Sequence, residues 1–165
     1  QHIRQFLEEE PNLLLRDNVK MHFTASAWVL NPSKNKVLML YHNIYQSWSW
    51  SGGHADGEGD LLSVAMKEVK EESGLVSLKP LSDSPISIEI LGVQPHYKKQ
   101  KYVSAHLHLN YTFLLHNTKE EKLKICPEEN SKVGWLSPDE AVCSSTEAWM
   151  KPIYKKLNQK MKEYL

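Results

Sequence analysis

Apolar and polar positions divide the chain into strands and helices. Two apolar runs, HFTASAWVL (22–30) and KVLMLYH (36–42), have the β-branched and aromatic content of strands, and the turn-forming segment NPSKN joins them. We expect these two runs to form a hairpin. Polar and aromatic residues then alternate in QSWSW (46–50), as they do in a half-buried strand. A glycine-rich loop follows.

Helical periodicity begins after that loop, over residues 60–73. Asp60 is placed to cap the N-terminus of this helix, and Gly74 stands where a glycine commonly ends one. Residues 137–140 (SPDE) form a capping box with proline at the first helical position, which predicts a second helix start. Apolar residues at helical spacing predict a closing helix: Ile153, Leu157, Met161 and Leu165.

The remaining apolar segments, 86–93, 105–115 and 132–137, predict further strands, whereas YKKQKY (97–102) is typical of a solvated loop or hairpin tip. Strands and helices are mixed without strict alternation, and no repeat or linker interrupts them. We therefore expect one domain over residues 1–165, of α+β or layered α/β/α class.

Composition changes this picture little. The 165 residues include 20 Lys plus Arg and 20 Asp plus Glu, so no overall field favours nucleic acid or an anionic membrane. No apolar run reaches about 18 residues, and QHIRQFLEEEP at the start lacks the apolar stretch of a signal peptide. Cys126 and Cys143 have no CxxC spacing and are expected to be reduced thiols, which favours a cytoplasmic location.

Three glutamates in the helix at 60–73 carry the chemical signal. Glu68, Glu71 and Glu72 have the i, i+3, i+4 spacing of one helix face, where like charges cost roughly 0.2–0.5 kcal/mol per pair. A divalent cation would turn this repulsion into ligation, and Mg²⁺ prefers oxygen ligands. The competing interpretation is a solvated charged face. The preceding glycines at 52, 53, 57 and 59 favour the metal site, because they let the backbone approach a ligand closely.

Segment 53–75 resembles the signature box of the Nudix hydrolases, the MutT-like proteins. That box reads Gly, five residues, Glu, seven residues, then Arg-Glu-apolar-x-Glu-Glu-x-Gly-apolar. Gly53 takes the first place and KEVKEESGL (67–75) fills the end in register. The segments SWSWSGGH (47–54) and EENSKVGWLSPDEA (128–141) resemble the strand before the box and a late strand with its helix start.

The resemblance implies a Nudix-like α/β/α sandwich with a mixed central sheet. It also implies a pyrophosphohydrolase acting on acid anhydrides, which uses Mg²⁺ or Mn²⁺ to cleave the diphosphate of a nucleoside diphosphate linked to another group. The expected partner is a small-molecule diphosphate substrate, with no nucleic acid and no membrane, and homodimers are common among similar proteins.

The same resemblance assigns candidate site residues. Glu71 and Glu72 match the metal-ligating pair, Glu68 matches a ligand or general base, and the Gly53 carbonyl matches a backbone ligand. Accessory carboxylates from a late loop match Glu128 and Glu129, which are otherwise exposed turn charges.

Two residues depart from the box. Gly59 stands where the box has Glu, with Glu58 and Asp60 beside it as displaced carboxylates, and Lys67 stands where the box has Arg. Lysine lacks the planar fork of arginine, so a brace between loop and helix would be looser. These departures leave open a module that binds a nucleotide or sugar diphosphate without hydrolysing it. An isopentenyl diphosphate isomerase-like enzyme is disfavoured, because neither cysteine lies near the glycine loop.

Histidines and tryptophans outside the box suggest further contacts. His106 and His108 alternate with leucines and share one strand face. With His54 and His96 they suggest a zinc site, although roles in a substrate pocket or in the fold are favoured. Trp50, just before the loop, is a candidate for stacking on a substrate base or for core packing.

Overall fold

The structure, a computed structural model, describes residues 2–98 and 100–165. The helices are α1 (His2–Glu9), α2 (Leu61–Ser73), α3 (Pro138–Ser144) and α4 (Met150–Met161), followed by the 3-10 helix η1 (Lys162–Tyr164). The strands are β1 (Met21–Leu30), β2 (Val37–His42), β3 (Ser47–Ser49), β4 (Ser51–His54), β5 (Leu78–Pro80), β6 (Ser87–Val93), β7 (His96–Lys98), β8 (Lys101–Val103), β9 (His106–Asn117) and β10 (Asn130–Leu136).

A mixed sheet forms the centre of the molecule. Its order is β10-β2-β1-β9-β5, with β3 paired to β2, β4 to β1 and β6 to β9. Strands β1 and β9 run parallel over their whole length, from Met21↔Leu107 to Leu30↔His116, and the other pairs are antiparallel. The parallel pair joins segments 86 positions apart in the chain, so the sheet depends on long-range contacts.

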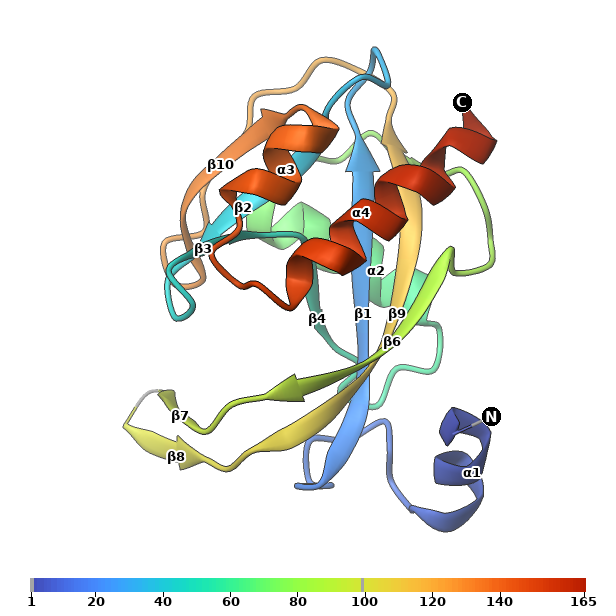
Figure 1. The fold of residues 1–165 in the computed structure, drawn as a ribbon, viewed down its shortest axis with the longest axis vertical. Helices are drawn as coiled ribbons and strands as arrows, with labels where there is room; N and C mark the ends of the chain where they lie inside the picture. The colour runs from blue at the N-terminus through green and yellow to red at the C-terminus, as the bar shows by residue number, and fades with distance from the viewer. Residues whose placement is uncertain (1, 99) are drawn as a thin grey trace.

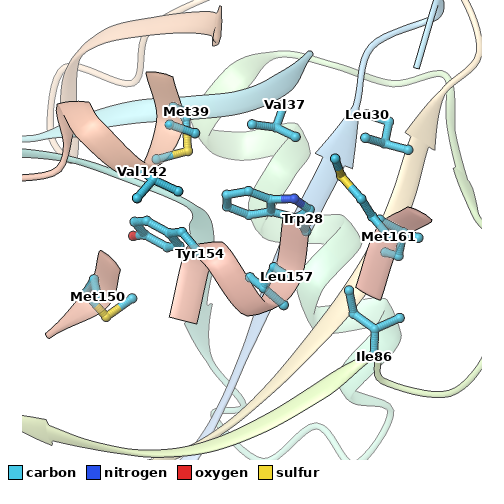
Figure 2. Close-up of a cluster of buried hydrophobic side chains, with 12 residues drawn as sticks. Trp28, Leu30, Val37, Met39, Ile86, Val142, Met150, Tyr154, Leu157 and Met161 are labelled. Carbon is cyan, nitrogen blue, oxygen red and sulfur yellow. The ribbon is translucent and has the colours of Figure 1, made fainter. Parts of the chain in front are cut away.

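Helices cover both faces of the sheet, as Figure 1 shows, with α3 and α4 on the near face and α2 on the far face. Side chains of β1 alternate between the faces. Trp28 packs on α4, where its ring lies 5.3 Å from that of the fully buried Tyr154 (Figure 2). Ala25 and Ala27 face α2 and pack in a cluster with Val69. The predicted α/β/α sandwich is confirmed.

Local sequence signals set several boundaries correctly. The β1–β2 hairpin closes at Leu30↔Val37. Helix α2 begins after Asp60, whose side chain accepts a hydrogen bond from the Ser63 amide, and ends at Gly74 in the left-handed conformation with φ 75°. Helix α3 begins with the predicted capping box at Ser137. Within the described residues, no helix has both the length and the apolar character that a membrane span requires.

Three elements differ from the expectation. Residues 51–54 form strand β4, which pairs with β1, whereas the sequence predicted that the glycines at 52 and 53 belong to a loop. The 97–102 segment is not a plain loop but the tip of a two-stranded arm, β7–β8, with Tyr97 opposite Tyr102, as the alternative of a solvated hairpin tip predicts; Lys99 lies outside the described residues. Leu165 does not extend the apolar face of α4, because the α-helix ends at Met161 and the Leu165 side chain is exposed.

Candidate functional site

The caps and the apolar face of α2 fix how its glutamates are presented. Val64, Ala65 and Val69 are buried against the sheet. The edge of the helix next to this face therefore lies against β4, which runs antiparallel to β1 at the same side of the sheet. Glu68 and Glu72 lie along this edge, where they meet β4, and Glu71 is turned further toward solvent.

Glu72 is a buried carboxylate, with an exposed fraction of only 7%. The Ser51 hydroxyl donates a short hydrogen bond to its Oε2, and the Gly52 amide donates to the same oxygen at 3.3 Å. These donors orient the carboxylate, but burial outweighs them and raises the pKa of Glu72 to about 8, with the nearby Glu68 and Glu129 adding to the rise. Without a cation, this carboxyl group is therefore largely protonated at neutral pH, and a bound cation would favour its charged form.

Glu68 packs against the backbone of Gly53. A Cβ atom built on Gly53 would lie 2.4 Å from the Glu68 carboxyl carbon and 2.6 Å from both of its oxygens. Only glycine leaves room for this contact. Burial, followed by the charge of Glu71, raises the pKa of Glu68.

A late loop supplies the next carboxylate. Glu129 contributes to the raised pKa of both Glu68 and Glu72, so its charge is felt at both positions. The neighbouring Asn130 is buried and donates a hydrogen bond of 3.0 Å to the Glu72 carbonyl, which fixes this loop to the end of α2. Glu128, the alternative candidate, has an exposed side chain.

Glu71 has a different environment. Its side chain is 55% exposed, and the Lys67 ammonium lies 3.7 Å from its Oε1. Such an exposed pair contributes little to stability, about 0–1 kcal/mol. Lys67 also lines a cavity of about 420 Å³ together with residues of the preceding loop: His54, Ala55, Asp56, Glu58, Ser63 and Val64.

The carboxylates beside Gly59 are engaged in local structure. Glu58 accepts a hydrogen bond of 2.8 Å from the Asp60 amide, and Asp60 caps α2. The hydrogen bonds from Ser63 lower the pKa of Asp60. A Cβ atom on Gly59 would meet nothing within 4 Å, so this position is open.

The comparisons with known proteins can be set against this geometry. The family model described as the NUDIX domain matches residues 20–157, which is most of the chain. The chain belongs to the Nudix family. The resemblance read from residues 53–75 is thereby confirmed. A comparison of the sequence with curated proteins gives no match.

Solved structures agree on the Nudix fold. The chain is similar to an Ap4A hydrolase of C. elegans in a binary complex, with TM-score 0.64 and 18% identity over 86% of this chain and 98% of the other. It is also similar to a NUDIX-family hydrolase from Clostridium perfringens (TM-score 0.64, 17% identity, 87% and 98% covered). A third is the E. coli dihydroneopterin triphosphate pyrophosphohydrolase (TM-score 0.59, 16% identity, 81% and 92% covered).

Nudix enzymes generally use divalent metals, and the residues of this chain fit such an ion. The charges of Glu68 and Glu129 both act on the buried Glu72, and carboxylate oxygens are ligands that suit Mg²⁺ or Mn²⁺. The raised pKa of the buried Glu72 means that a cation bound nearby would stabilise its charged form. Glu71 and the Gly53 carbonyl lie beside this group, on the next positions of α2 and β4.

The candidate contacts outside the Nudix box lie on the other face of the sheet or in the core. His54, His106 and His108 come together, whereas His96 lies on the β7–β8 arm with its Nδ1 at the Gln94 carbonyl. The Trp50 ring packs edge-on against Tyr154 at 5.6 Å and is partly buried in the core, as its packing alternative predicted.

Two features were missed by the sequence reasoning. His22 joins the three histidines through the parallel pairing His22↔His108, which no local pattern shows. Arg16 forms a bidentate pair with Asp56, and the Gly57 amide donates to the Leu14 carbonyl at 2.9 Å. The N-terminal segment thus braces the loop before α2. An arginine 40 residues from an aspartate gives no sequence signal for such a pair.

Proposed function

We propose that this Nudix chain is a divalent-metal-dependent pyrophosphohydrolase that cleaves the diphosphate of a nucleoside diphosphate linked to another group. The observation that carries the proposal is the close packing of the Glu68 carboxylate on Gly53, next to the buried Glu72, whose pKa is raised by burial and then by Glu68 and Glu129. The names of the similar structures include hydrolases of Ap4A and of dihydroneopterin triphosphate, both of which contain linked phosphates.

In this proposal Glu71, Glu72 and the Gly53 carbonyl hold Mg²⁺ or Mn²⁺, with Glu129 as the accessory carboxylate. A bound ion of this kind supplies neutralisation of phosphate charge and a more acidic water. The chain supplies orientation, because Ser51 and the Gly52 amide fix the Glu72 carboxylate before any ligand arrives.

Glu68 is the proposed general base. A base works best when its pKa lies near the working pH, and burial together with Glu71 raises the pKa of Glu68 toward that range. Its carboxylate would accept the proton of the attacking water. Packing against Gly53 holds the side chain in one place while it does so.

The experiment is a panel of nucleoside diphosphate derivatives assayed for phosphate-monoester release with Mg²⁺, with Mn²⁺ and with EDTA. We expect turnover of at least one compound only with metal, and a loss on the order of 10²–10³-fold in kcat for Glu72→Gln and Glu71→Gln, the range of a lost electrostatic contact in a transition state. Glu163→Gln, an exposed glutamate on η1, is the matched control. Turnover of the Gln variants at the wild-type rate would remove the carboxylates from the mechanism.

A second candidate function is a Nudix module that binds a diphosphate ligand without cleaving it. Gly59 in an open position and Lys67 paired with the exposed Glu71 favour it, because neither supplies the brace of the box. Calorimetric binding of a panel compound with no product after prolonged incubation would select this candidate.

A further inference from the structure

Four imidazole rings gather at one end of the sheet. His22 comes from β1, His54 from β4, and His106 and His108 from β9. Ring centroids lie 4.8 Å apart for His22–His106, 5.0 Å for His22–His54 and 5.1 Å for His22–His108. The pairs His54–His108 and His106–His108 are each 5.0 Å apart. We call these four residues the histidine cluster.

The register of the strands explains the gathering. His22 is opposite His108 in the parallel pair β1–β9, and Thr24 is opposite His54 in the antiparallel pair β1–β4. Side chains two positions apart on a strand point to the same face. Because Ser51 and Gly53 of β4 face the glutamates of α2, His54 faces the opposite side of the sheet. The histidine cluster is therefore separate from the carboxylate site.

Backbone carbonyls fix the orientation of two of the rings. His22 Nδ1 lies 3.1 Å from the Asn18 carbonyl, and His106 Nδ1 lies 2.8 Å from the Ser104 carbonyl. A carbonyl can only accept, so both Nδ1 atoms carry the proton and each neutral ring presents the bare lone pair of Nε2. This arrangement, a ring held through its other nitrogen, is typical of metal-ligating histidines.

The bare nitrogens point into the histidine cluster. His22 is 4% exposed, and its Nε2 has no hydrogen-bond partner among the described residues. His106 Nε2 lies 3.1 Å from His108 Nε2, which therefore donates to it when no ion is bound. A buried acceptor without a partner costs free energy, so His22 Nε2 favours a ligand that accepts its lone pair.

The electrostatic environment of the rings favours a cationic ligand over an anionic one. Burial lowers the pKa of His22, and burial together with His54, His22 and His106 lowers the pKa of His108 well below its ordinary value. For His22 and His108 both shifts favour the neutral form, in which a ring can offer a lone pair. Neutral imidazoles bind cations and give phosphate or another anion no charge to pair with.

We propose that the histidine cluster is a binding site for a zinc-class transition-metal ion, with His22, His54 and His108 as ligands and His106 next to them. One ligand nitrogen from each of the first three lies within 4.8 Å of the others. Bonds of about 2.0–2.1 Å in a tetrahedral site place nitrogens roughly 3.3 Å apart, which small rotations of the rings achieve. Nitrogen ligands select zinc over Mg²⁺, which prefers oxygen.

The position gives such an ion a structural role. It would join β1, β4 and β9 at the end of the sheet from which the β7–β8 arm extends (Figure 1), since β8 ends at Val103 and β9 begins at His106. A site closed by three or four protein ligands is typical of structural zinc. This proposal does not rest on the proposed hydrolysis, and either can fail without the other.

The test is a zinc titration of the whole chain, stripped of metal and monitored by competition with a chromophoric chelator. We expect one tight site per chain in the wild type and in His96→Gln, the control from outside the histidine cluster. His54→Gln and His106→Gln replace half-buried rings. His54→Gln should weaken binding on the order of 100-fold or more, because outer-shell partners alone account for about 10–100-fold. His106→Gln tests whether the fourth ring is a ligand or a neighbour.

A second measurement does not depend on variants. NMR of the imidazole nitrogens in wild-type protein should show zinc-induced shifts at His22, His54 and His108, and unchanged resonances at His96 and His116. Shifts confined to other histidines would overturn the proposal. So would equal zinc affinity in His54→Gln and His96→Gln, or zinc binding that disappears in Glu71→Gln/Glu72→Gln and persists in His54→Gln, because the ion would then belong to the carboxylate site.

Discussion

At the scale of single residues, Gly53 matters through the side chain that it lacks. Its backbone occupies the space into which the Glu68 carboxylate packs, at distances no Cβ atom could tolerate. Gly53 lies in a strand and needs no unusual backbone conformation, so its requirement comes from this contact alone. The first glycine of the box thus sets the position of a catalytic candidate.

Gly53→Ala is predicted to abolish the proposed hydrolysis while leaving the fold intact. The new Cβ would push the Glu68 carboxylate away, and a misplacement of about 1 Å can cost on the order of 10²-fold in rate. The free energy of unfolding should change by less than about 1 kcal/mol, because the displaced carboxylate is the flexible end of a side chain. Steady-state kinetics and urea unfolding measure the two effects.

Gly92→Ala is the matched control for Gly53→Ala. Gly92 also lies in a strand, on β6, and a Cβ atom there would meet nothing within 4 Å. Wild-type kinetics in Gly53→Ala would show that Glu68 is not the base.

At the scale of elements, the loop before α2 is held from outside the box. Arg16 pairs with Asp56 in bidentate geometry, and backbone hydrogen bonds join residues 13–14 to Phe23 and Gly57. Among the described residues, Lys67, at the arginine position of the box, forms an ion pair with Glu71, at 3.7 Å. The loop before α2 is therefore braced by Arg16, and this brace does not involve Glu71, the exposed candidate metal ligand.

Restoring the box should raise activity. In Gly59→Glu/Lys67→Arg, a planar guanidinium can pair with the new carboxylate, which meets no obstacle at the open position 59, and Glu71 is released from Lys67. We predict a gain on the order of tenfold in kcat/KM, equivalent to about 1.4 kcal/mol. Each single variant should gain less, so a double-mutant cycle measures the coupling. Strictly additive effects would contradict the pairing.

At the scale of the whole molecule, the sequence predicted what local chemistry determines. Asp60, Gly74 and the box at Ser137 set helix ends within the chain's immediate neighbourhood, and α2 begins and ends as they indicate. The proposed metal ligands could be named from the sequence for a similar reason, because Glu71 and Glu72 share one helix with Glu68 and Gly53 precedes that helix by a short loop, whereas Glu129 came only from the family resemblance.

The sequence did not predict the pairing of strands that lie far apart in the chain. Two glycines made residues 51–54 resemble a loop, but ten residues of β1 provide an edge on which they form a strand. His22 could not be assigned to the histidine cluster, because its partner His108 is brought opposite only by the parallel β1–β9 pair. Contacts of this kind depend on tertiary structure and leave no periodic mark in the sequence.

The buried charge of Glu72 predicts how the stability of the whole chain depends on pH. Its folded-state pKa of about 8 lies above the unfolded value of 4.5, so the folded state binds more protons between them. Stability from this group is full below about pH 4.5 and is lost as the pH rises through 8. In EDTA, we expect the wild type to lose on the order of a few kcal/mol between pH 5 and 8.5.

Urea unfolding at both pH values measures this loss. Glu72→Gln should show a much smaller difference, because its amide does not titrate and can still accept from Ser51. Glu163→Gln should behave as the wild type, and Mg²⁺ should reduce the loss at pH 8.5. An equal pH dependence in wild type and Glu72→Gln would show that the carboxylate is not buried as described.

Residues of the short strand β4 belong to two sites on opposite faces of the sheet. Gly53 packs against the glutamates, and His54 lies among the imidazoles. Substitutions can alter either side independently. Adding or deleting a single amino acid within 51–54 would instead exchange the two orientations and present each partner with the wrong neighbour. Directed evolution of this chain should therefore tolerate many replacements around this tetrapeptide but no change in its length.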